Sequence, residues 1–155
     1  MSRVDPYRLL KFVHVVSVTL WVGGSFSLSV LTWSVARSGD LPSLARILRL
    51  ARLYGAALVG PASLLTLFTG LGMLWVLGIS AEALWVRWGF VGIIGHFLIG
   101  ATLLRRANQR LWALAYSPSV AGEALASARR QLALVNSAYL ALLLSVVAAM
   151  TVKPV

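Results

Sequence analysis

Long apolar segments alternate with polar and basic connections along this chain of 155 residues. The first segment, Phe12–Trp33, contains no formally charged side chain and is long enough to cross about 30 Å of hydrocarbon as a helix. Its polar and amphipathic residues recur every three or four positions, which places them roughly on one helical face. They are His14, Ser17, Trp21, Ser25, Ser29 and Thr32. Polar side chains that face lipid are energetically costly, so we predict that this face points into a helix bundle.

Three further apolar segments predict three more transmembrane helices. The expected spans cover about residues 9–36, 55–78, 87–104 and 131–151. An amphipathic stretch from Leu41 leads directly into the second span, where Pro61 predicts a kink. A polar helical extension is expected to follow the third span to about Tyr116. The sequence therefore predicts an all-α polytopic membrane protein: one domain over residues 1–155, built as an up-down-up-down four-transmembrane-helix bundle.

Polar residues at the expected helix ends predict where the helices begin. Asp5 and Pro6 favour a helix start before the first span, and Asp40 is placed to cap the amphipathic stretch. The Ser-Pro-Ser sequence at residues 117–119 predicts a break, after which a fourth helix is expected to start near Val120.

Composition and charge support the membrane class. Hydrophobic residues make up 59% of the chain and charged residues 12%, against about a quarter charged in an average soluble domain. The net charge of +10 comes from basic residues in the connections, where they fix topology and meet anionic lipid and do not indicate nucleic acid. The first and third connections hold nine of the Lys and Arg residues, and the rest of the chain holds five. This asymmetry predicts both termini outside and the long basic connections in the cytoplasm.

The sequence offers no motif of an enzyme. It has no cysteine, which excludes disulfides, thiolate metal sites and cysteine nucleophiles. Its four acids fall in expected loops or helix ends, so none is placed as a catalytic carboxylate pair or as a proton carrier within the membrane. They are Asp5, Asp40, Glu82 and Glu123. No catalytic residue is identified, and whether the protein is an enzyme stays open.

Both histidines, His14 and His96, fall within expected spans, where an ionisable side chain is a functional hypothesis. One hypothesis is a b-type haem held between them, because bundle cofactor sites are built from facing helices. Gly92 and Gly100 lie one turn to either side of His96 and would leave room for a porphyrin, with Trp21 in the same candidate site. The alternatives are hydrogen bonds across helices for the histidines and close helix packing for the glycines. Whether the two imidazoles lie at the same depth is left open.

Two other function classes fit the same pattern. Met73 and Met150 are expected near the depth of His14, and imidazole with thioether suits copper(I) at the outer face or a His/Met-ligated haem. Scattered methionines are also ordinary packing residues. A non-catalytic membrane subunit or scaffold is the other class, with basic hairpins that bind a partner protein or anionic lipid. A redox or membrane protein partner is therefore considered, and the oligomeric state stays open.

Three motifs resemble those of a known family. They are H-x6-W-x-G-G at His14 to Gly24, G-P-x7-T-G at Gly60 to Gly70, and M-x-x-K-P at Met150 to Pro154. Over nearly its whole length the chain resembles a family of small bacterial integral membrane proteins of unknown function. The resemblance implies a multi-pass protein of the bacterial inner (plasma) membrane. The first span alone is also similar to CopD copper-resistance proteins and HemJ-type proteins of haem biosynthesis, which implies haem or copper.

Overall fold

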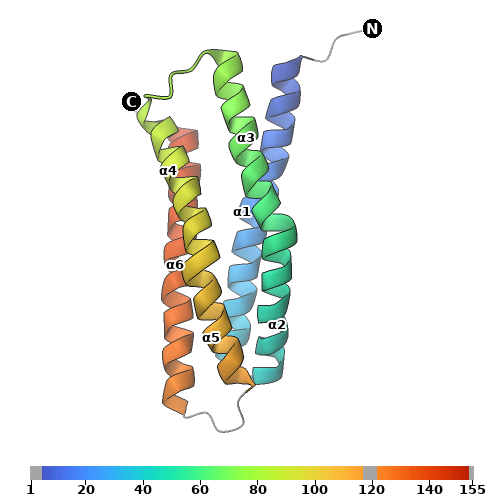
Figure 1. Ribbon diagram of the computed structural model, residues 1–155, viewed down its shortest axis with the longest axis vertical. Coiled ribbons are helices and arrows are strands. Elements are labelled where there is room, and N and C mark those ends of the chain that lie inside the picture. Colours follow the sequence, from blue (N-terminus) through green and yellow to red (C-terminus); the bar gives the residue numbers. More distant parts are fainter. Residues whose placement is uncertain (1–4, 117–121, 154–155) are drawn as a thin grey trace.

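The fold is a bundle of four helical columns, seen in a computed structural model that describes residues 5–116 and 122–153 (Figure 1). Column I is α1 (Pro6–Ser38), and column IV is α6 (Gly122–Val152). Column II joins α2 (Leu41–Tyr54), η1 (Gly55–Val59) and α3 (Gly60–Leu77). Column III joins α4 (Leu84–Ile99), η2 (Gly100–Leu104) and α5 (Arg105–Ala115). Each column is long and apolar enough to cross a membrane, so the predicted all-α polytopic bundle is confirmed.

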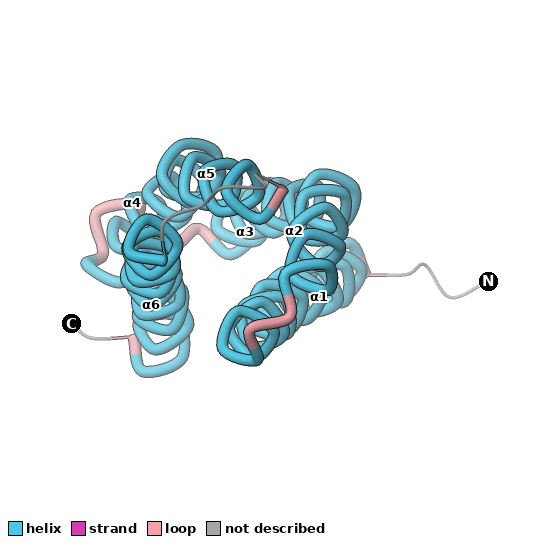
Figure 2. Tube along the Cα trace, turned by 90° about the horizontal axis from the view of Figure 1, so that it is seen from below, coloured by secondary structure: helices cyan, strands magenta, loops and turns pink. Residues whose placement is uncertain are grey.

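Neighbouring columns run in opposite directions around the bundle. Viewed along the axis, α1, α2, α5 and α6 follow one another in a ring (Figure 2). The closest packing joins α1 to α3 and α4 to α6, and α2 also packs against α5. Three of the expected spans lie within single columns, and the second, residues 55–78, ends one residue beyond α3. This is the up-down-up-down order that short and medium connections favour.

The two ends of the bundle differ in charge. One end, which we call the terminal end, holds the start of α1, the end of α6 and the connection between α3 and α4 (Figure 1). The opposite end, which we call the basic end, is formed by α2, α5, the last turn of α1 and the first turns of α6. Its arginines are Arg37, Arg46, Arg49, Arg52, Arg105, Arg106, Arg110, Arg129 and Arg130.

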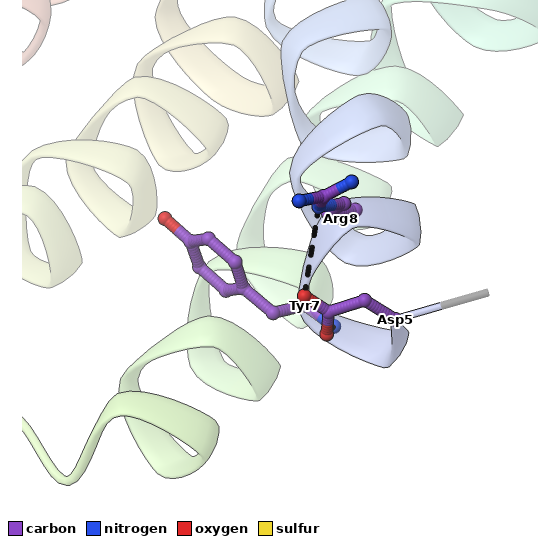
Figure 3. Close-up of polar contacts among 3 residues, drawn as sticks. All are labelled: Asp5, Tyr7 and Arg8. Atoms are coloured by element: carbon purple, nitrogen blue, oxygen red, sulfur yellow. Dashed lines mark hydrogen bonds and ion pairs between the residues drawn. The ribbon is translucent and has the colours of Figure 1, made fainter. Parts of the chain in front are cut away.

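Side-chain caps fix two helix starts as the sequence predicts. Asp5 accepts a hydrogen bond from the Tyr7 backbone N–H at 3.0 Å and pairs with Arg8 at 3.7 Å (Figure 3). Asp40 accepts one from the Ser43 backbone N–H at 3.1 Å. Each carboxylate satisfies an N–H group that has no partner within its own helix. The predicted break at residues 117–119 and the helix start near Val120 lie outside the described residues.

Two π-helical turns, η1 and η2, interrupt columns II and III, and the sequence analysis did not predict them. In η1 the Gly60 N–H bonds to the carbonyl of Gly55, five residues back. Pro61 follows directly and has no N–H to bond to the carbonyl of Ala57. The wider turn therefore stands where Pro61 predicts a kink. Single π-helical turns occur frequently at functional sites.

Most of the described buried apolar residues form two separate clusters along the bundle axis. The cluster at the basic end contains Ala36, Leu44, Leu48, Ala107, Leu111, Ala128 and Leu132. The central cluster contains Trp21, Val59, Ala62, Ile93 and Leu143. The space between the two clusters is not filled by apolar side chains, and this is where the candidate site lies.

Candidate ligand cavity

A cavity of about 1130 Å³ lies between the two apolar clusters, and residues of all four columns line it. Its lining residues on α1 and α6 are buried or half-buried, whereas many of those on columns II and III are exposed. Columns II and III touch where α2 meets α5 and where α3 meets α4. Within the described residues, no close backbone contact joins η1 to η2. The open side of the cavity, which we call the window, therefore lies between the two π-helical turns.

Three aromatic rings close the inner end of the cavity. The Trp21 indole Nε1–H donates to Nε2 of His96 at 2.9 Å, and the His96 ring stacks on Tyr139 with the ring centroids 3.8 Å apart. Because Nε2 accepts, the neutral imidazole carries its hydrogen on Nδ1. His96 is only 3% exposed, and among the described residues its Nδ1 has no hydrogen-bond partner. The Nδ1–H of His96 is thus a buried donor beside the inner end of the cavity.

The polar stripe of the first helix forms one wall of the cavity. Ser29 donates to Asn136 of α6 at 2.8 Å, and the Ser25 and Tyr139 hydroxyls lie 3.5 Å apart. The stripe residues Ser17, Trp21, Ser25, Ser29 and Thr32 are all buried, which confirms that this face points into the bundle. Polar groups of α1 and α6 therefore satisfy one another across the cavity wall.

Cationic and amide side chains gather where the cavity reaches the basic end. Arg49 and Arg52 come from α2, and Arg105, Asn108 and Gln109 come from α5. Their three- and four-residue spacing places each set on one helical face. The Asn108 Oδ1 atom is buried and has no hydrogen-bond partner among the described residues. We call these five residues the basic mouth.

His14 lies apart from the cavity, between α1 and α3. Its Nδ1 atom is 3.0 Å from the Thr69 hydroxyl oxygen. That hydroxyl donates to the Leu65 carbonyl at 2.6 Å, so it accepts from the Nδ1–H of His14. A Cβ added at Gly70 would lie 3.4 Å from the imidazole, so glycine leaves the ring room to lie against α3. The half-buried imidazole thus makes a hydrogen bond between helices, as the alternative interpretation of the sequence holds.

Comparison with known proteins gives a family and no activity. The profile of a family described as "Predicted integral membrane protein (DUF2269)" matches residues 8–154. The chain belongs to this family. No curated protein and no solved structure matches the chain. The resemblance to a family of unknown function is therefore confirmed, while a likeness to CopD or HemJ-type proteins is not shown by these comparisons.

In this family member the two histidines do not meet. His96 contacts Trp21, which lies seven residues along α1 from His14, or about 10 Å at 1.5 Å per residue. Each imidazole has a different partner, Trp21 for His96 and Thr69 for His14. The structure therefore does not bring His14 and His96 together as a facing pair.

The two glycines beside His96 receive side chains of α6. A Cβ added at Gly92 would lie 2.2 Å from Cγ2 of Val146, and one added at Gly100 would lie 3.3 Å from the ring of Tyr139. The space expected for a porphyrin at these two positions is thus taken by close helix packing, the alternative stated above.

The methionines have separate surroundings. The Met150 methyl group lies against Gly89 of α4, where an added Cβ would be only 1.9 Å away. Met73 is half-buried on α3. The described residues hold no group of three or more His, Cys, Asp or Glu that could bind a metal ion.

The residues that sequence reasoning missed are those of the basic mouth. From the sequence, the basic residues of the connections are expected to fix topology and meet anionic lipid, and the segment after the third span is expected only to extend the helix. A usable signal was present in two sets of residues with helical spacing. Arg49, Arg52 and Ala56 are three and then four residues apart in column II, and Arg105, Asn108 and Trp112 have the same spacing in column III. Two faces of this kind, next to glycines in the same helices, favour a shared cavity.

Proposed function

We propose that this protein is a non-catalytic membrane subunit that binds an amphiphilic molecule, taken from the lipid bilayer, in the central cavity. The observation that carries the proposal is a cavity lined by all four columns whose open side lies between two apolar transmembrane columns. A ligand dissolved in the bilayer reaches such an opening by lateral diffusion.

The dimensions of the cavity suit a molecule of one lipid leaflet. Its volume of about 1130 Å³ lies just above the usual range for small-molecule pockets. Along α1 it extends from Trp21 to Thr32, roughly 16 Å at 1.5 Å per residue. That length is about half of a hydrocarbon core of about 30 Å. A single acyl or isoprenoid chain with a polar head matches this depth.

The window provides the way to test the proposal. Ala56 of η1 and Ala101 of η2 are exposed and line the cavity, whereas Ala57 and Leu103 are exposed in the same two turns and do not line it. Ala56→Trp and Ala101→Trp should therefore block the cavity, and Ala57→Trp and Leu103→Trp should only face lipid.

The measurement is native mass spectrometry of protein extracted in mild detergent, which reports the small molecules retained. The native protein, Ala57→Trp and Leu103→Trp should retain the same ligand, and Ala56→Trp and Ala101→Trp should lose it. A photoreactive amino acid at position 56 should label the ligand more strongly than one at position 57. Equal retention by all four variants would overturn the proposal.

Haem b is a second candidate for the same cavity. The observation that favours it is that His96 and three arginines line one space, since guanidinium groups pair well with carboxylates such as the haem propionates. Trp21 occupies Nε2 of His96, so iron ligation at that atom requires the indole N–H to move away. A Soret band in the purified protein that is lost in His96→Ala would support haem. Copper found in a colourless sample and lost in His14→Ala would support copper handling instead.

A further inference from the structure

We infer that the ligand of the central cavity is an anionic amphiphile whose oxyanion headgroup binds Arg49, Arg52 and Arg105 of the basic mouth. This inference rests on the proposed function and adds the chemical class and the orientation of the ligand. The headgroup lies between α2 and α5, and the apolar chain extends toward Trp21.

The positive charge of the basic mouth favours an anionic headgroup. Two guanidinium groups from α2 and one from α5 border the same cavity, and its lining includes no Asp or Glu. Within the described residues, none of these three arginines has an acidic partner, because the one ion pair found there joins Asp5 and Arg8. Guanidinium groups that border one cavity repel each other, and a phosphate or carboxylate bound among them relieves that repulsion.

The Asn108 side chain of the basic mouth adds hydrogen-bonding groups for the same headgroup. Asn108 lies three residues after Arg105 on α5, so both side chains extend from one helical face toward the cavity that both line. The Oδ1 atom of Asn108 is buried without a partner among the described residues. Buried amide groups of native proteins are normally hydrogen-bonded. An oxyanion only accepts hydrogen bonds, so Asn108 would bind the headgroup through its Nδ2–H groups and not through Oδ1.

The cavity wall fixes the orientation of the chain. The hydroxyl of Ser29 already donates to Asn136, so this part of the wall does not need a hydrogen-bond partner from the ligand. Beyond it the lining is largely aliphatic or aromatic and closes at Trp21 and Tyr139. An apolar chain inserted from the mouth therefore meets mostly carbon, and its charged end stays at the level of the arginines.

General attraction of arginines to an anionic membrane surface is the competing explanation, and it applies to every arginine at the basic end. The chain offers a matched control for it. Arg46, Arg106 and Arg130 are exposed at the same end and do not line the central cavity. The triple variant Arg49→Ala/Arg52→Ala/Arg105→Ala and the triple variant Arg46→Ala/Arg106→Ala/Arg130→Ala each remove three positive charges.

The experiment uses native mass spectrometry of the full chain reconstituted with equal amounts of phosphatidylglycerol, phosphatidylcholine and oleate. The native protein should retain an anionic species, and its mass identifies the headgroup as phosphate or carboxylate. The mouth variant should lose the preference for the anion over phosphatidylcholine by roughly 100-fold, since it removes all three guanidinium groups that border the cavity and charge-assisted hydrogen bonds are the strong ones. The control variant should change it by less than about threefold, because its exposed arginines do not line the central cavity.

Three results would overturn the inference, and they are separable from failure of the proposed function. Equal loss in both triple variants would assign the preference to general surface attraction. Retention of phosphatidylcholine by the native protein, with loss on Ala56→Trp, would leave cavity binding in place and refute the anion. An unchanged preference for the anion in a mouth variant that still elutes as folded protein would also refute the role of the three arginines. Arg49→Lys/Arg52→Lys/Arg105→Lys, which keeps the charge, should retain the anion and so separates charge loss from misfolding.

Discussion

The two halves of the bundle on either side of the Trp21–His96 contact differ in how closely their helices pack. Toward the terminal end, glycines receive side chains of the neighbouring column: Gly89 receives Met150 and Gly92 receives Val146. Toward the basic end, the columns separate at η1 and η2 and surround a cavity. The terminal half thus has helices in close contact, and in the other half, which we call the cavity half, columns II and III are held apart at the π-helical turns and meet again where α2 packs against α5.

The contrast teaches where a bundle in lipid obtains its stability. Apolar side chains gain little by moving from lipid to a helix interface, so close van der Waals contact and interhelical hydrogen bonds hold the columns together. The terminal half relies on the first, through glycine. The cavity half adds the second, through Ser29 with Asn136 and Ser25 with Tyr139, to the apolar cluster at the basic end. We therefore expect the terminal half to dominate the free energy of unfolding and the cavity half to dominate ligand binding.

The largest effect on stability should come from filling a glycine contact in the terminal half. Gly92→Ala should destabilise the folded protein by about 1–3 kcal/mol, because the new Cβ would lie 2.2 Å from the stiff, β-branched Val146. Unfolding in mixed detergent, followed by circular dichroism, measures this. Val146→Ala should restore part of the loss in the double variant. Gly23→Ala is the control, since no atom lies within 4 Å of its added Cβ; equal effects at both glycines would refute the packing role of the terminal half.

The contact between the halves should rank second. Trp21→Phe keeps an aromatic ring but removes the N–H that donates to His96, leaving a buried nitrogen without its donor. We expect a loss of about 1 kcal/mol. Trp75→Phe, at a side chain that is 87% exposed, should leave the unfolding transition unchanged and provides the control. A transition unmoved by Trp21→Phe would show that the aromatic inner end adds nothing to stability.

A polar pair of the cavity wall should contribute less. Ser29→Ala removes the donor to Asn136, and interhelical hydrogen bonds within membranes average about 0.6 kcal/mol. A double-mutant cycle with Asn136→Ala measures the coupling energy. Coupling as large as the Gly92 effect would reverse the proposed division between the two halves. Ser29→Ala should also reduce ligand retention, measured in parallel, and this reduction should be easier to detect than the small loss of stability.

The smallest effect should come from the helix cap at the basic end. Hydrogen bonds from Ser43 to Asp40 hold the pKa of that carboxyl below its usual value. The stabilisation is therefore fully present above the usual pKa and is lost as the pH falls through the lowered one. Asp40→Asn should remove this acid-induced loss while keeping a cap at neutral pH, and Asp40→Ala should weaken α2 at every pH. An identical pH dependence of unfolding in the native protein and Asp40→Asn would exclude the cap as its source.

The architecture could be predicted from the sequence because lipid imposes strict rules on length and polarity. The stripe Ser17, Trp21, Ser25, Ser29 and Thr32 identified the buried face of α1, since only the bundle interior accepts those groups. Asp5 and Asp40 identified two helix starts, because capping depends on residues adjacent in sequence. Local chemistry and membrane thickness together thus determined helix number, order and the inward face of the first column.

The partners of the polar side chains could not be predicted in the same way. His14 and His96 were considered as a pair because they are the only imidazoles, yet the structure gives them Thr69 and Trp21 as partners. Which groups meet depends on the rotation and depth of each column, which one sequence does not specify. The cavity escaped prediction for the same reason, since it arises where columns II and III fail to touch.

The π-helical turns also set how the chain tolerates changes in length. Removing one residue from an ordinary helix such as α1 turns everything beyond it by about 100° and shifts it by 1.5 Å, which would carry Ser25 and Ser29 off their partners. A π-helical turn contains one residue more than an α-helical turn requires. Deleting Ala57 from η1 would let that turn revert to α-helical bonding while the residues on both sides keep their orientation. Columns II and III can therefore lose one residue each and stay in register, at the expense only of the widened turns beside the window.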